Sequence, residues 1–146
     1  MEEVNVLVVG NNPIELGHLY DNLQSVPDKK IVAVIAFDLK SIFERLAKFS
    51  PTYILIDDNI GTPELKVTVK ALAKYRKTRE IPITILKNSN YHEAITSGAM
   101  NYVLKHGLTG TVLYNALRSS LRLKETQRFL YEAWRKRKKQ MLRLLK

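Results

Sequence analysis

The chain has 146 residues, enough for one domain with its own core, and its 45% hydrophobic and 26% charged residues are typical of globular proteins. It contains no cysteine, which excludes disulfide scaffolds, thiolate metal sites and cysteine nucleophiles, and its apolar runs are too short to span a bilayer, so we expect a cytoplasmic protein without membrane insertion. The net charge of +10 is concentrated at one end, because residues 118–146 carry 11 Lys and Arg against two Glu, whereas residues 1–117 carry 13 against 12 acids.

Short runs rich in valine and isoleucine alternate along the chain with segments of helical periodicity. In chain order we predict a strand at Val4–Val9, a helix at Ile14–Leu23, a strand at Ile31–Phe37, a helix at Leu39–Phe49, a strand at Tyr53–Ile56, a helix at Pro63–Lys77, a strand at Ile81–Leu86, a helix at Asn90–Ser97 and a strand at Tyr102–Leu104. The strand runs are nearly continuous, as in strands buried on both faces. This alternation predicts an α/β fold with a parallel sheet of five strands.

A long last helix is predicted from Thr109 to Lys146, a stretch without proline. At 1.5 Å per residue it measures about 55 Å, whereas a body of the remaining size has a diameter of about 35 Å. Part of this helix must therefore project, fold back or pair with another chain. We predict two units, a domain at residues 1–121 and a basic helical extension at residues 122–146.

The extension carries an apolar seam with coiled-coil spacing. One heptad position holds Leu123, Leu130, Arg137 and Leu144, and the other holds Gln127, Trp134 and Met141. The seam is about three heptads long and is interrupted by Arg137. One prediction from this seam is a homodimer through the last helix.

A run of cations offers a second interpretation of the same extension. The five consecutive residues are Arg135, Lys136, Arg137, Lys138 and Lys139. Their charge would attract phosphates, so the alternative function is that of a nucleic-acid-associating regulator. Consecutive residues spread around a helix, and only Tyr131 and Trp134 offer stacking surfaces, so a solvated connector helix is the competing interpretation.

Polar residues follow four of the predicted strands. In parallel α/β sheets, binding and reaction sites lie at the carboxyl ends of the strands. The segments at these ends are Gly10–Asn12, Asp57–Asn59, Lys87–Ser89 and Lys105–His106. We therefore expect a binding or reaction site at the edge of the sheet where these four segments meet.

Three of these strands carry a resemblance to the response-regulator receiver domain. Pro51–Asn59 (PTYILIDDN) resembles the strand that ends in the phosphoacceptor aspartate, Ile81–Lys87 resembles the fourth strand, and Gly98–Lys105 resembles the fifth strand with its lysine. The resemblance covers about residues 4–121. It implies a doubly wound, flavodoxin-like sheet in the order 2-1-3-4-5, and a role in two-component phosphorelay signalling rather than an enzyme activity.

The resemblance also assigns roles to single residues. It makes Asp57 the phosphoacceptor, Lys105 its charge partner and Tyr102 the switch aromatic. It gives Asn59 a place beside a Mg²⁺ ion. The partners that it implies are a histidine kinase or an output protein, with a homodimer through the last helix or through the face of the fourth and fifth helices.

Two departures from the family predict a degenerate site. Receiver domains end the first strand with two acidic residues that ligate Mg²⁺, whereas this chain has Gly10 and Asn11, of which only Asn11 offers an oxygen and a neutral one. The metal set would then be Asp57, Asn59 and Asn11, so Mg²⁺ binding is in doubt. The second departure is Lys87, where the family has Ser or Thr, and its ammonium could pair with Asp57 directly.

Motifs of other chemistries are missing from the sequence. The three histidines, His18, His92 and His106, do not have metal-ligand spacing. No phosphate-binding glycine loop or nucleophile elbow is present. The sequence therefore predicts a signalling domain that acts by protein–protein contact.

Overall fold

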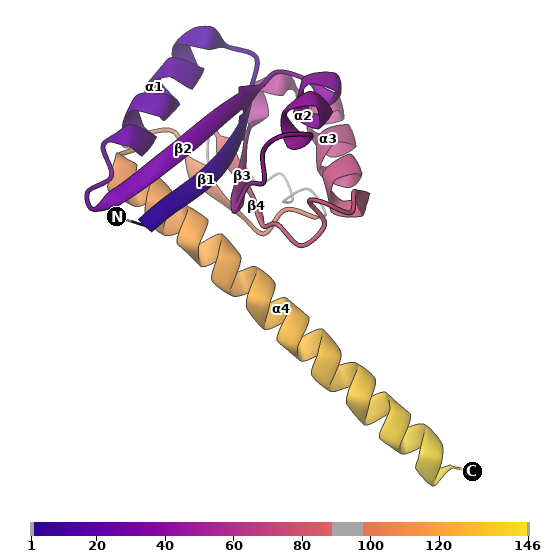
Figure 1. Cartoon of the computed structure of the whole chain (residues 1–146). Coiled ribbons are helices and arrows are strands. Elements are labelled where there is room, and N and C mark those ends of the chain that lie inside the picture. Colours follow the sequence, from indigo (N-terminus) through magenta and orange to yellow (C-terminus); the bar gives the residue numbers. More distant parts are fainter. Residues whose placement is uncertain (1, 89–97, 146) are drawn as a thin grey trace.

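The computed structural model describes residues 2–88 and 98–145 and contains one parallel sheet in the order β2-β1-β3-β4-β5 (Figure 1). The strands are β1 (Glu2–Val9), β2 (Lys29–Ala36), β3 (Tyr53–Asp57), β4 (Ile83–Lys87) and β5 (Asn101–Leu104). The helices are α1 (Pro13–Gln24), α2 (Leu39–Leu46), the short 3-10 helix η1 (Asp58–Ile60), α3 (Thr62–Lys74) and α4 (Gly110–Leu144). The predicted α/β class, the parallel sheet, the strand order and the long last helix are confirmed.

Some predicted boundaries were wrong by a few residues. The helix predicted at Pro63–Lys77 ends at Lys74, where the hydroxyl of Thr78 donates to the carbonyl of Leu72 over 2.7 Å and so occupies an acceptor of the last turn. The helix predicted to reach Phe49 ends at Leu46. The helix predicted at 90–97 lies outside the described residues.

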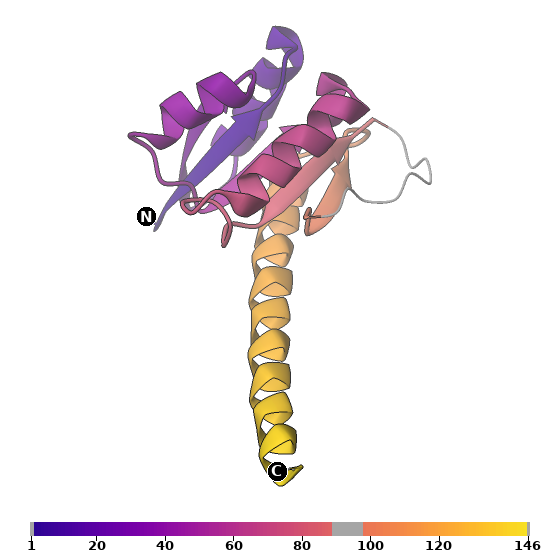
Figure 2. The same ribbon diagram turned by 90° about the vertical axis from the view of Figure 1, so that its right-hand side faces the viewer.

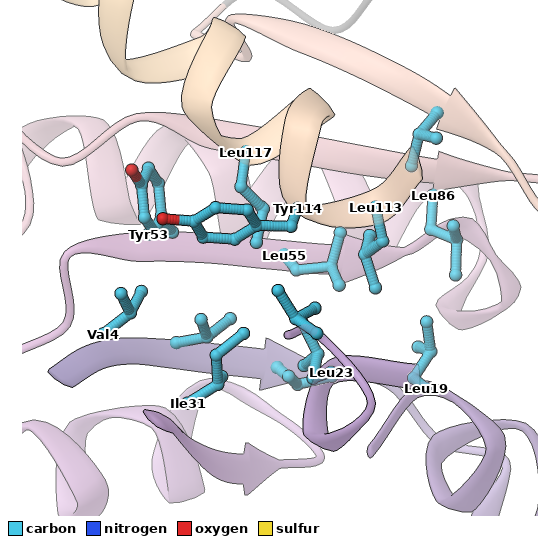
Figure 3. Close-up of a cluster of buried hydrophobic side chains, with 14 of the residues drawn as sticks. Val4, Leu19, Leu23, Ile31, Tyr53, Leu55, Leu86, Leu113, Tyr114 and Leu117 are labelled. Atoms are coloured by element: carbon cyan, nitrogen blue, oxygen red, sulfur yellow. The ribbon is translucent and has the colours of Figure 1, made fainter. Parts of the chain in front are cut away.

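The strands are buried on both faces, which explains their nearly continuous apolar sequence. In β1, Val4, Val6 and Val8 join a core with α1 and α4, whereas Leu7 and Val9 join a second core with α2 and α3. Figure 3 shows the first core, in which side chains from the sheet meet those from α1 and α4. Within residues 2–88 and 98–145, helices α1 and α4 cover one face of the sheet and α2 and α3 the other, so the domain is a three-layer sandwich.

Helix α4 packs on the sheet only through its first third. Its buried residues are Gly110, Leu113, Tyr114, Leu117 and Ser120, and every residue from 125 to 145 is exposed. Figures 1 and 2 show the rest of the helix leaving the body as a straight rod. Among residues 2–88 and 98–145, no helix is both long enough and apolar enough to cross a membrane.

Candidate functional site

Asp57 is the last residue of β3 and the centre of a charged site at the carboxyl edge of the sheet. Its side chain is buried, with only 1% of the residue exposed. Oδ1 of Asp57 accepts from the ammonium of Lys105 at 2.6 Å and from the backbone N–H of Asn59 at 2.9 Å. Lys105 directly follows β5, so two strands that are not neighbours in the sheet supply the pair. The structure therefore brings Asp57 and Lys105 into direct contact, and their roles as phosphoacceptor and charge partner stay predictions.

A second carboxylate, Glu15, reaches the same ammonium from the first turn of α1. The distance from Lys105 Nζ to Glu15 Oε2 is 3.1 Å. The helix start is fixed by Asn12, whose side chain accepts from the backbone N–H groups of Ile14 and Glu15. Sequence reasoning missed Glu15, although an acid three residues after an asparagine cap is a recognisable helix-start pattern that places a carboxylate at the end of β1.

The residues after Asp57 complete the site. Asp58 begins η1 instead of continuing the strand, so its Oδ1 lies 3.9 Å from Lys105 Nζ. This oxygen is buried and accepts no hydrogen bond within the described part of the chain. The side-chain amide of Asn59 donates to Glu15 and accepts from Asn88 at 2.9 Å. In the part of the chain that the structure describes, three carboxylates therefore face the ammonium of Lys105, and Asn59 links Glu15 to Asn88 beside them.

The end of β1 shows what replaces the two acids of the receiver pattern. A Cβ atom on Gly10 would come within 2.8 Å of Leu16 Cδ2 and 3.4 Å of Asp57 Cβ. Leu16 is buried, so an acidic side chain at position 10 would have to displace part of the core. The neighbouring Asn11 is exposed at the rim. The end of β1 therefore packs closely against Leu16 of α1 and against Asp57.

Lys87 and Tyr102 lie side by side on β4 and β5. The ammonium of Lys87 is 5.3 Å from the centre of the Tyr102 ring, within the range of a cation–π contact. Tyr102 is 41% exposed, so its ring is at the surface of the sheet edge. The predicted roles of Lys87 as a charge partner of Asp57 and of Tyr102 as a switch aromatic stay predictions.

Burial and hydrogen bonding act in opposite directions on the two ionised groups of the pair. Burial raises the pKa of Asp57, against the hydrogen bonds from Lys105 and Asn59 that lower it. Burial lowers the pKa of Lys105, but the hydrogen bonds to Asp57 and Glu15, together with the negative charges of these two groups, outweigh it, and the net pKa is raised. The charged form of Lys105 is therefore favoured by its two carboxylate partners.

We expect the fold to lose stability in alkali because of this lysine. A group whose pKa is raised on folding contributes stability fully below its unfolded value, 10.5 here, and that contribution is lost as the pH rises through the folded pKa. Urea unfolding between about pH 9 and pH 12 should show a steeper loss for the wild-type chain than for Asp57→Asn, in which Lys105 has lost its nearest partner. If the free energy of unfolding falls equally with pH in the two proteins, the expectation is contradicted. The contributions of groups that titrate in both proteins cancel in this comparison.

The donor set does not fit a magnesium ion as it is arranged. Mg²⁺ requires several oxygen ligands at short, near-octahedral distances. Here the carboxylates of Glu15, Asp57 and Asp58 face an ammonium instead. Across residues 2–88 and 98–145, no group of three or more acidic or histidine side chains is placed to hold a metal. The metal roles of Asp57, Asn59 and Asn11 stay predictions.

The basic run lies far from this site. The segment from Arg135 to Lys139 belongs to the exposed part of α4, in the orange-to-yellow region of Figure 1, well away from the body. Two cations of this run contact aromatic rings of the same helix: Arg135 lies over Tyr131, and Lys138 lies over Trp134. The structure therefore separates the charged site from the basic extension.

No protein-family model and no curated protein matches this sequence. Solved structures match its fold. The receiver domain of a sensor histidine kinase from Pseudomonas aeruginosa, which has a magnesium ion in its active site cleft, gives a TM-score of 0.68 at 15% identity over 82% of this chain and 98% of its own. A chemotaxis response regulator of Vibrio cholerae gives 0.65 at 20% identity, over 82% of this chain and 99% of its own.

A third solved structure matches as well. The response regulator receiver modulated diguanylate cyclase from Pelobacter carbinolicus gives a TM-score of 0.63 at 18% identity, over 85% of this chain and 97% of the other. These neighbours are response regulator receiver domains. The chain has their fold: five parallel strands in the order 2-1-3-4-5, with helices on both faces.

Proposed function

We propose that this chain is a receiver-like domain of two-component signalling with a degenerate phosphorylation site, and that it acts through contacts with a histidine kinase or an output protein. The observation that carries the proposal is the ion pair between Asp57 and Lys105 at the carboxyl edge of a receiver-type sheet. As proposed, the domain is a signalling module that acts by contact with other proteins and not as an enzyme.

The degeneracy follows from the charges around Asp57. Transfer of a phosphoryl group to a carboxylate requires positive charge against the transferring oxygens, which a metal ion supplies in many phosphoryl-transfer sites. Among the described residues Lys105 contacts Asp57, and it is shared with Glu15. An anionic phosphoryl group on Asp57 would also stand beside the carboxylates of Glu15 and Asp58, which oppose it. Asp57 is therefore a poor acceptor in the arrangement seen here.

The second part of the proposal concerns the quaternary structure. The first third of α4 belongs to the domain core, whereas residues 125–145 are exposed. The apolar seam begins at Leu123 and continues along this exposed part. An exposed helix of this length gains most of its stability from packing its apolar face. This supports a division into a receiver-like domain, residues 1–121, and a helical extension, residues 122–146, through which two copies associate.

A small phosphodonor provides the test of the site. We expect the chain to keep its unmodified mass after incubation with acetyl phosphate and Mg²⁺, under conditions in which a receiver domain that retains the acidic pair is labelled. The physical reason is that Gly10 and Asn11 supply no carboxylate, so charge neutralisation of the incoming phosphoryl group is weak. Intact-mass spectrometry measures the result.

Asp57→Asn is the matched control for this experiment. A phosphoryl adduct on the wild-type chain that disappears in Asp57→Asn would show a working acceptor and contradict the degenerate site. An adduct that persists in the variant would locate labelling elsewhere. Asn is close to Asp in size and keeps an oxygen that can accept from Lys105, so the comparison isolates the loss of the carboxylate.

A further inference from the structure

The exposed part of α4 is amphipathic in a way that favours one kind of partner. Its apolar side chains are half or more exposed, for example Leu130 at 60% and Trp134 at 55%. With Leu123, Met141 and Leu144 they form a seam of 3.5-residue spacing along one side of the rod. Large apolar side chains exposed along one side of a helix are typical of an interaction site.

We infer that the partner is a second copy of this chain and that the two helices pair antiparallel. The inference rests on the proposed association through the extension and adds its orientation. In an antiparallel pair with Leu130 opposite Trp134 of the partner subunit, Leu123 comes opposite Met141 of the partner subunit. Each large apolar residue of these layers then meets another apolar residue.

The position of Arg137 is the first argument for this orientation. In a parallel dimer equivalent residues face each other, so the two Arg137 side chains would meet inside the seam, where like charges repel. In the antiparallel register Arg137 comes opposite Gln127 of the partner subunit, whose amide oxygen can accept a hydrogen bond from a guanidinium. The two polar interruptions of the seam therefore pair with each other.

The distribution of charge along the extension is the second argument. Residues 133–146 carry seven Lys and Arg and no acid, whereas residues 124–132 carry two Lys and Arg against two Glu. A parallel pair would place two strongly basic halves side by side. An antiparallel pair places each basic half beside the half of the partner that carries no net charge. Coulomb repulsion between the helices is then much weaker.

The charged residues on the side of the rod away from the seam leave room for close pairing of helices. On its outer side the rod carries Arg128, Glu132, Lys136 and Lys139, which remain solvated when the seam is covered. Arg128 and Glu132 form an ion pair on that outer side at 3.3 Å. The seam is thus the side of the extension with the fewest charges.

Cysteine crosslinking tests the orientation directly, since the chain has no cysteine of its own. We expect Leu123→Cys and Met141→Cys to form a mixed disulfide when the two variants are combined, about tenfold more than either variant forms with itself. The two variants differ in mass, so intact-mass spectrometry separates the three species. Phe129→Cys, on the outer side of the helix, is the matched control and should give little crosslink in any mixture.

Light scattering separates the failure of this inference from the failure of the proposed association. A chain that is dimeric by light scattering but whose Leu123→Cys and Met141→Cys variants crosslink mainly with themselves would have parallel helices, which overturns the orientation alone. A chain that is monomeric at micromolar concentration would overturn both. A monomer that sediments with vesicles of phosphatidylcholine and phosphatidylserine, or that shifts duplex DNA, would assign the seam or the basic run to another occupant.

Discussion

Replacing Lys105 with methionine should destabilise the domain by about 3 kcal/mol, the largest effect expected for a charge change in this chain. The substitution keeps the length and the apolar stem of the side chain but removes the ammonium. Asp57, which is buried, and Glu15 would then lose the cation that both contact. The lysine side chain is 16% exposed, so we place the cost at the lower end for broken buried pairs. Urea unfolding followed by circular dichroism measures the change.

Lys30→Met is the matched control for this prediction. Lys30 pairs with Glu3 at 3.7 Å on the surface, where both side chains are more than half exposed. Exposed ion pairs contribute about 0–1 kcal/mol, so the control should be close to the wild type.

A double variant shows whether the cost of Lys105→Met comes from the ion pair. Asp57→Asn combined with Lys105→Met should cost less than the sum of the two single changes, with a coupling of about 1–3 kcal/mol. If the two costs are strictly additive, Lys105 and Asp57 stabilise the fold independently, and the ion pair between them contributes nothing to stability.

Gly110→Ala should destabilise the protein by about 2–3 kcal/mol because the glycine fits against the end of α1 without space for a methyl group. A Cβ atom at this position would lie 2.3 Å from the backbone oxygen of Asn22 and 2.5 Å from Ser25 Oγ. Backbone cannot rotate away as a side chain can, so α1 and α4 would have to separate. Their contact closes one of the two cores, through Leu23 and Leu113. The free energy of unfolding and the near-ultraviolet spectrum report the result.

The same substitution at Gly17 provides a control with the opposite sign. Gly17 lies in the interior of α1, and a Cβ atom there would meet nothing within 4 Å. Gly17→Ala should therefore stabilise the domain by about 0.5–1 kcal/mol, since alanine loses less backbone entropy in a helix. If both variants shift stability in the same direction, the close approach at Gly110 does not decide the effect.

These two pairs of variants test different contacts in the structure, the charged site and the packing of α1 against α4. Gly110 fixes the start of α4 against α1, and α1 in turn carries Glu15 to Lys105. A looser contact between α1 and α4 should therefore disturb the position of Glu15 beside Lys105 as well as the packing of the core. The Lys105 variants, by contrast, change the site without changing the apolar packing of the two cores.

The sequence by itself determined the class of fold. Apolar runs such as Val4–Val9 are continuous because alternate residues enter the two cores on opposite faces of the sheet, and this property is local. The projecting helix was also predictable from local sequence, because its length follows from the number of residues in a stretch without proline. The pairing of Asp57 with Lys105 was predictable from strand ends that meet at one edge and from the receiver resemblance.

Only the tertiary structure decided what surrounds that pair. Glu15 and Lys105 are 90 residues apart in the chain, and their contact depends on the angle at which α1 leaves the sheet. The turn of Asp58 into the site and the packing of Leu16 against Gly10 likewise depend on backbone conformation and on close packing between elements. Sequence periodicity reports which residues are buried, whereas distances between side chains from different elements are set when those elements pack.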